Sequence, residues 1–197
     1  MSQELEIEFK NIVSEADFDR LVNAFHIQPE DFHVQHNHYL DTESFLLKKA
    51  GCALRVREKN GTFELTLKEP AVDGLLETNE VLSRSEAETL LAGGPFPDGP
   101  VKKAIQYLIT DFTNLKHFGT LSTKRAETAF EGGLLVFDNS FYLNREDYEI
   151  EYEAAERKSG EKIFHDLFKR YQIPVKQADN KVRRFYNEKL RQSAGNK

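Results

Sequence analysis

Strict alternation of charged and apolar residues is the feature of this sequence that most restricts its fold. Residues 4–10 read ELEIEFK, with charges at the even positions and apolar residues at the odd ones. Residues 145–153 read REDYEIEYE, with charges at the odd positions and Tyr148, Ile150 and Tyr152 opposite them. A period of two is typical of a β-strand, whose side chains point alternately to opposite faces of a sheet. Both segments are therefore predicted strands with one apolar face and one charged face.

The same alternation recurs in the middle of the chain with the opposite charge. Arg55 and Arg57 alternate with apolar residues, Lys68 ends a second run of this kind, and Arg125 lies on the polar face of a third. The first and last strands of the series carry carboxylates, whereas the middle strands carry Arg and Lys. A face that is only solvated usually mixes the two signs, so this sorting favours a functional surface. A sheet with one face simply in water is the alternative.

Charged faces on several strands need either bulk water or a shared lumen. If the sheet closes into a barrel, alternate residues point into one lumen, and such a lumen cannot be dry because unpaired buried charge is very costly. Arg side chains bind phosphate oxygens through paired hydrogen bonds, and clustered carboxylates suit a hard divalent cation. We therefore hypothesise a hydrated channel that holds a polyphosphate together with Mg²⁺ or Mn²⁺.

Composition excludes several other classes. The 197 residues have a formal net charge of −6, which argues against general nucleic-acid binding. A single cysteine, Cys52, excludes an internal disulfide, and no apolar run approaches the ~20 residues that span a bilayer. We expect a cytoplasmic protein with no membrane partner. No linker divides the chain, so one domain is predicted over residues 1–190, with a flexible tail over 191–197.

Amphipathic segments between the strands predict helices that cover the apolar faces of the sheet. Helical spacing of apolar residues follows Ser14, occupies residues 101–115, and returns in two helices near the C-terminus. The predicted fold class is α+β. His36 and His38 share a strand face with Val34 and Leu40, so we interpret them, with nearby His33, as packing residues and not as a metal site.

The chain resembles the CYTH family, also called triphosphate tunnel metalloenzymes, and most closely its small single-domain bacterial members. ExExK alone is a weak motif, but the ordered series is highly specific and runs from about residue 4 to 186. The matching segments are EIEFK (6–10), YLDT (39–42), LLKKAGCALRVRE (46–58), ELTLKEP (64–70), TKR (123–125), VFDNS (136–140), EIEYE (149–153) and NKVRRF (180–185).

The resemblance implies a closed antiparallel β-barrel of roughly eight strands, a tunnel with helices packed outside. It implies metal-dependent hydrolysis of a triphosphate-containing small molecule with Mg²⁺ or Mn²⁺. Inorganic triphosphate is the favoured substrate because the sequence has no clear base-binding motif. The alternatives are an adenylate cyclase that converts ATP to cyclic AMP and pyrophosphate, and a non-catalytic polyphosphate or nucleotide-binding module. Monomer and homodimer both stay open.

The resemblance also implies a role for each matching residue. Phosphate binding falls to Arg55, Arg57, Lys68, Arg125 and Lys181. Metal binding falls to Glu6, Glu8, Asp138, Glu149 and Glu151. The catalytic set is Lys10, beside the phosphate that is cleaved, with Glu149 and Glu151. Further candidates are Glu77 with Glu80 as its competitor, Asp41 next to Tyr39 in the motif, and Arg184 one helical turn from Lys181.

Overall fold

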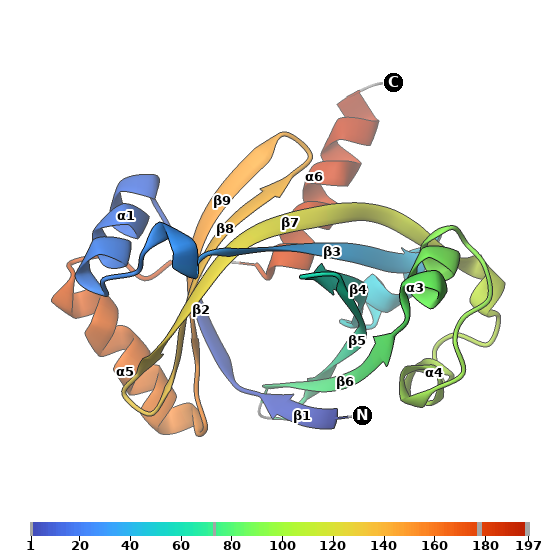
Figure 1. Ribbon diagram of the computed structural model, residues 1–197, viewed down its shortest axis with the longest axis horizontal. Helices are drawn as coiled ribbons and strands as arrows, with labels where there is room; N and C mark the ends of the chain where they lie inside the picture. The colour runs from blue at the N-terminus through green and yellow to red at the C-terminus, as the bar shows by residue number, and fades with distance from the viewer. Residues whose placement is uncertain (1, 73, 177–178, 196–197) are drawn as a thin grey trace. The chain divides into compact units, whose positions relative to one another are not determined.

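The computed structural model describes residues 2–72, 74–176 and 179–195 (Figure 1). Its strands are β1 Ser2–Glu6, β2 Glu8–Val13, β3 His33–Thr42, β4 Ala53–Lys59, β5 Thr62–Ala71, β6 Gly74–Leu82, β7 Leu115–Phe130, β8 Gly133–Tyr142 and β9 Arg145–Glu153. Its α-helices are α1 Glu15–Ala24, α2 Leu46–Lys49, α3 Arg84–Leu91, α4 Pro100–Ile105, α5 Arg157–Arg170 and α6 Lys181–Gly195. Short 3₁₀ turns cover Pro29–Asp31 and Phe112–Asn114. The α+β class is confirmed.

The strands form one sheet in the order β1-β6-β5-β4-β3-β7-β8-β9-β2. The two end positions of this order belong to β1 and β2, which only Ile7 separates along the chain. This connectivity is that of the predicted antiparallel barrel. The described strands number nine and not eight, because the single strand expected at residues 4–10 is divided at Ile7 and each part pairs with a different neighbour.

The chain divides into two units, each of which is discontinuous in sequence. The first comprises Met1–Leu5 and Gln35–Leu121, and the second comprises Glu6–Val34 and Ser122–Lys197. The predicted single domain over residues 1–190 therefore stays a prediction. Residues 191–195, expected as part of a tail, belong to α6.

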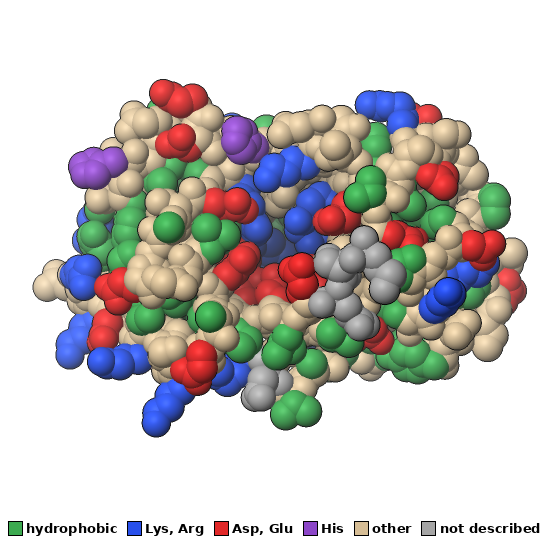
Figure 2. Space-filling model, turned by 60° about the horizontal axis from the view of Figure 1, so that its bottom comes forward, with side chains coloured by type: hydrophobic (Ala, Val, Ile, Leu, Met, Phe, Trp, Pro, Cys, Tyr) green, Lys and Arg blue, Asp and Glu red, His purple; other side chains and the backbone are tan. Residues whose placement is uncertain are grey.

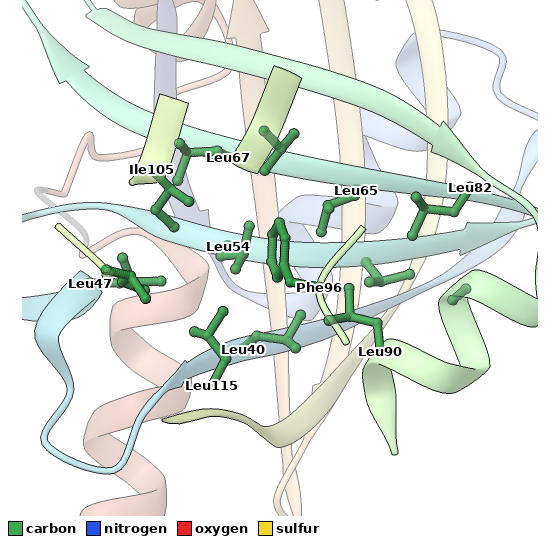
Figure 3. Close-up of a cluster of buried hydrophobic side chains, with 14 of the residues drawn as sticks. Leu40, Leu47, Leu54, Leu65, Leu67, Leu82, Leu90, Phe96, Ile105 and Leu115 are labelled. Carbon is green, nitrogen blue, oxygen red and sulfur yellow. The ribbon is translucent and has the colours of Figure 1, made fainter. Parts of the chain in front are cut away.

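The first unit is built around a leucine-rich core (Figure 3). Leu54 and Val56 of β4 point into it beside Leu65 and Leu67 of β5, and all four are fully buried. Helices α3 and α4 cover this face with Leu90 and Ile105 among others. Because side chains alternate along a strand, burial of these residues leaves Arg55, Arg57 and Lys68 on the opposite face.

The second unit places different layers on the two faces of its strands. Helices α1 and α5 lie on the apolar face of β2, β8 and β9, as Figure 1 shows. Phe18 of α1 and Phe164 of α5 pack there with Phe137 and Ile150. Helix α6 lies on the other, charged face, where its Lys181 and Arg184 contact carboxylates of β8 and β9. Amphipathic strands therefore receive an apolar helix layer on one side and a basic helix on the other.

The helix predicted over residues 101–115 is much shorter in the structure. Helix α4 ends at Ile105, and Asp111 then accepts hydrogen bonds from the backbone N–H and the hydroxyl of Thr113. A short polar side chain that bonds the nearby backbone offers an alternative to helix, which explains why Asp111 begins a 3₁₀ turn over Phe112–Asn114 where the prediction had helix. The apolar spacing still served burial, since Ile105 and Ile109 both lie in the core. No helix among the described residues is long and apolar enough to cross a membrane.

Candidate functional site

Strand register brings the predicted acidic residues of the second unit onto one face. Asp138 of β8 lies directly between Arg125 of β7 and Glu149 of β9. Two residues further along β9, Glu151 lies opposite Lys10 of β2. Residues separated by more than a hundred positions in sequence therefore become neighbours through backbone pairing alone.

Three carboxylates form the centre of this face. Asp138, Glu149 and Glu151 each offer an oxygen within 4.8 Å of the others, and all three side chains are buried. Three buried like charges repel one another, and burial of each carboxylate is costly without a partner. The cluster therefore requires cations, and the oxygen-only ligand set fits Mg²⁺ or Mn²⁺ better than a softer metal.

Three basic side chains neutralise the cluster in the protein itself. Arg125 donates to Asp138 through Nε at 2.7 Å and Nη2 at 2.5 Å, and to Glu151 at 2.8 Å. Lys181 lies 2.6 Å from Asp138 and also contacts Glu149 and Glu151. Arg184 donates to Glu149 at 2.7 Å. The ammonium of Lys181 therefore occupies the position among the three carboxylates that a metal ion would take.

The cations set the charge states of the cluster. Burial opposes ionisation of Glu151, but Lys181, Arg125 and Lys10 outweigh it and hold the pKa of this carboxyl well below its usual range. Burial also opposes the charge on Lys181, yet the surrounding carboxylates raise its pKa well above the ordinary value. Glu151 and Lys181 therefore form an ion pair at neutral pH, whereas burial raises the pKa of the neighbouring Glu149.

The ExExK segment lies beside this cluster. Lys10 contacts Glu8, and burial of its ammonium is offset by Glu8, Glu151 and Glu149, so its pKa is raised. Glu8 is paired across the strands with Glu153. Sequence reasoning did not select Glu153, although it continues the alternation of Glu149 and Glu151. Burial raises the pKa of Glu153 to about 7, with Glu6, Glu151 and Glu8 adding to the effect against Arg125.

The predicted basic residues of the first unit lie on its polar face. Across β3, β4, β5 and β6, register aligns Tyr39, Arg55, Thr66 and Asn79 in one row. Arg57 lies in the next row and donates to Asn37 at 3.3 Å. On the face drawn in Figure 2, acidic and basic side chains are both abundant.

Several polar atoms of this row have no protein partner. Arg55 Nε, Thr66 Oγ1 and Asn79 Oδ1 are buried without a hydrogen-bond partner among the described residues. Buried polar groups in folded proteins are nearly always bonded, so such a row needs an explanation. A bound ligand or water would satisfy these atoms, which makes this row the part of the first unit best suited to a polar ligand.

The structure separates the further candidates by what they contact. Glu77 lies opposite Lys68 and forms an ion pair with it, whereas Glu80 belongs to the row of Leu65 on the core side. Glu77 therefore shares the polar face, as predicted, and its competitor Glu80 does not. Asp41 accepts bonds from the backbone N–H groups of Thr42, Leu47 and Lys48, so it holds α2 in place.

Comparison with known proteins agrees with this architecture. The Bacillus subtilis (strain 168) protein named "Putative triphosphatase YjbK" is 49% identical over 189 residues, which cover 96% of this chain and 98% of that protein. The Bacillus halodurans crystal structure named "putative adenylate cyclase (bh2851)" is 45% identical with a TM-score of 0.91, covering 94% of this chain and 100% of that one.

A more distant structure supports the fold alone. The Hippeastrum protein HpAC1 is 23% identical with a TM-score of 0.78, covering 93% of this chain and 96% of that one. The CYTH domain family matches residues 4–186, which include every strand from β2 to β9 and the ordered charged residues described above. The chain therefore belongs to the CYTH family.

Proposed function

We propose that this protein hydrolyses a triphosphate, with inorganic triphosphate as the preferred substrate, in a reaction that requires Mg²⁺ or Mn²⁺. The observation that carries the proposal is the buried cluster of Asp138, Glu149 and Glu151, interleaved with Arg125 and Lys181. A pure anion-binding module has no use for three buried carboxylates, whereas a metal-dependent phosphoryl-transfer enzyme needs them. The name of the Bacillus subtilis relative points to the same activity.

In this proposal the carboxylates hold the cation, and Glu6 and Glu8 add further oxygen ligands beside them. A bound divalent cation supplies Lewis-acid polarisation of phosphate oxygens. Arg125 and Lys181 neutralise charge that spreads over the phosphoryl oxygens, and Lys10 binds the phosphate that is cleaved. Arg55, Arg57 and Lys68 of the first unit bind phosphate oxygens through their charged donors.

Water must lose a proton as it attacks the terminal phosphorus. Glu149 and Glu151 are the acidic residues expected to position this water. Glu153 is an additional proton acceptor, because a carboxyl whose pKa is about 7 exchanges protons efficiently near neutral pH. Glu153→Gln separates the two assignments: it removes the rise of activity with pH near pH 7 only if Glu153 takes the proton.

An adenylate cyclase is the second candidate, because the 45% identical Bacillus halodurans relative bears that name. In that reaction the ribose 3′-hydroxyl, and not water, attacks the phosphorus. The residues that hold a metal and phosphates serve either reaction. Only the product therefore separates the two candidates.

The deciding experiment incubates the full-length protein with triphosphate, thiamine triphosphate, ATP and GTP, each with Mg²⁺, Mn²⁺ or a chelator. We expect phosphate release from triphosphate with metal and none with chelator. Cyclic AMP as the dominant product from ATP would replace the hydrolase with the cyclase. Tight binding of triphosphate without any product would indicate a binding module.

A further inference from the structure

One row of polar residues on the first unit combines a basic side chain with uncharged neighbours. Strand pairing aligns Arg55 of β4 with Thr66 of β5, and Thr66 in turn with Asn79 of β6. On the other side of Arg55, its partner on β3 is Tyr39. Directly paired residues of neighbouring strands point to the same face, so these four side chains line one strip of the polar face. All four residues belong to the first unit.

The two neighbouring rows differ from this one because each contains a carboxylate. Arg57 lies directly opposite Glu64. Lys68 lies opposite Glu77 and forms an ion pair with it. Arg55 instead lies between two uncharged residues. The paired neighbours therefore offset the charge of Arg57 and of Lys68 but not that of Arg55, so an anion is attracted most strongly to the row of Arg55.

Thr66 lies in the middle of this arrangement with an unpaired hydroxyl. The residue is fully buried, and its Oγ1 has no hydrogen-bond partner among the described residues. The same is true of the buried Nε of Arg55. Lys68 is two positions further along β5 and therefore shares the face of Thr66. Two cationic side chains thus flank a hydroxyl that can still donate a hydrogen bond, and a phosphate oxygen accepts from both kinds of donor.

Access to the hydroxyl depends on the side chains around it. Arg55, Lys68 and Asn79 are each partly exposed. Arg and Lys side chains are long and rotate about several bonds. Rotation of Arg55 and Lys68 toward an anion therefore uncovers the hydroxyl of Thr66 between them.

Asn79 supplies a second uncharged donor. Its Oδ1 is buried without a hydrogen-bond partner in the described part of the chain. A side-chain amide carries an oxygen at one end and an NH₂ group at the other, so half a turn about its last bond puts Nδ2 in the place of Oδ1. In that orientation Asn79 donates to an anion that Arg55 and Thr66 hold.

We propose that Thr66 and Asn79 are substrate-positioning residues, which bind one phosphate group of the triphosphate beside Arg55 without a metal ion. The inference rests on the proposed function for the identity of the anion, and it deepens that function by assigning contacts to two uncharged side chains. Guanidinium, hydroxyl and amide groups donate directly to phosphate oxygens, whereas the carboxylates of the second unit can reach them only through a cation. Binding at this row should therefore persist when metal is removed.

The test measures triphosphate binding to the full-length protein by calorimetry in the presence of a chelator, so that neither metal nor hydrolysis contributes. Thr66→Val is expected to raise Kd by about fivefold, because it keeps the shape of the side chain and removes the hydroxyl. Thr66→Ser keeps the hydroxyl and should bind triphosphate as the wild type does. Asn79→Asp should raise Kd by about tenfold or more, because it places a carboxylate beside the anion.

Two control variants test whether these effects belong to the row. Thr78→Val removes a hydroxyl from the residue before Asn79, and Thr78 lies opposite Leu67 on the side of the apolar core. Asn60→Asp adds the same charge as Asn79→Asp at the exposed turn between β4 and β5. Both controls should leave Kd unchanged. Thermal unfolding verifies that each variant is folded.

Steady-state kinetics with Mn²⁺ separates this inference from the proposed function. If Thr66 positions the substrate, Thr66→Val raises KM for triphosphate and changes kcat little. Equal Kd in the wild type, Thr66→Val and Asn79→Asp, or no binding by the wild type in chelator, would overturn the inference, and hydrolysis of triphosphate by the same protein would still support the proposed function. Binding that depends on Thr66 in a protein that releases no phosphate would support the inference and reject the triphosphatase.

Discussion

The charged faces of the two units differ in how their buried polar groups are paired. In the second unit every carboxylate of the cluster has a basic partner within the protein, with Arg125, Lys181 and Arg184 balancing Asp138, Glu149 and Glu151. In the first unit the row of Arg55, Thr66 and Asn79 retains buried atoms without a hydrogen-bond partner in the described part of the chain. The carboxylates of one face are therefore ion-paired before any ligand binds, whereas a ligand would complete the row of the other face.

The difference has a consequence for binding. Because Lys181 contacts all three carboxylates of the acidic cluster, we expect a metal ion to bind there in exchange for its ammonium. A ligand of the first unit instead gains hydrogen bonds that no protein group has to give up. Removal of an ion-pair partner from the acidic cluster should therefore lower the stability of the second unit. Removal of an unpartnered polar atom from the row of Arg55, Thr66 and Asn79 should not lower the stability of the first unit.

The largest effect is expected on activity. Glu151→Ala should reduce metal-dependent phosphate release from triphosphate by about a thousandfold, which is about 4 kcal/mol of transition-state stabilisation, because it removes a cation ligand and one of the three carboxylates around Lys181. Glu8→Ala should act in the same direction. Steady-state assays with Mn²⁺ measure the loss, and circular dichroism checks that the fold survives. Full activity in either variant would exclude its role in metal binding.

The next largest effect is on stability. Asp138→Ala should lower the free energy of unfolding by about 3 kcal/mol, because Arg125 and Lys181 both lose a buried partner. Glu131→Ala removes one side of an exposed ion pair with Arg170 and should change stability by less than about 1 kcal/mol. Urea denaturation compares the two. Equal losses would show that the cluster is not held by its ion pairs.

Metal affinity should respond in the opposite direction at Lys181. Lys181→Met removes the ammonium from among the carboxylates, so Mn²⁺ binding without substrate should tighten by about tenfold, or about 1.4 kcal/mol. Arg183→Met is the control, because Arg183 lies on the same helix and pairs with Asp179, outside the acidic cluster. Calorimetry in the absence of triphosphate measures both. Unchanged or weaker Mn²⁺ binding in Lys181→Met would disprove the exchange.

Two buried threonines sharpen the comparison between the units. Thr123 of the second unit exchanges a hydrogen bond with Ser140 at 3.1 Å, whereas the hydroxyl of Thr66 in the first unit has no partner among the described residues. Thr123→Val should cost about 1 kcal/mol of stability, and Thr66→Val should cost nothing or stabilise. Thr66→Val should also raise KM for triphosphate severalfold if its hydroxyl binds the substrate. Identical effects at both sites would remove the contrast.

The smallest effect is a pH dependence. The pKa of Glu153 is about 7 in the folded protein against 4.5 for an ordinary glutamate, so between these values the folded state binds more protons than the unfolded state. The contribution of Glu153 to stability must therefore fall as pH rises from about 4.5 to 7. Urea denaturation of metal-free protein across this range should show a downward slope that Glu153→Gln reduces. If the slope is the same in Glu153→Gln, the pH dependence of stability arises from other titratable groups.

Much of the acidic site was predictable because its residues repeat with the period of a strand. ELEIEFK and REDYEIEYE each identify a face, and pairing of β2 with β9 then brings Lys10 to Glu151. Glu153 carries the same signal and ends the EIEYE segment, but the resemblance implies no role for it. The roles of the phosphate-binding residues stay predictions, as does the cytoplasmic location.

The amino-acid sequence by itself determined which face of each strand is charged, because alternation along a strand is a local property of the chain. It also determined the family, through the order of its charged motifs. Only the tertiary structure decided which charges meet: Lys181 among three carboxylates, Glu77 and not Glu80 beside Lys68, and His117 against His38. These contacts depend on strand register and helix packing between segments that are distant in sequence, which no local pattern specifies.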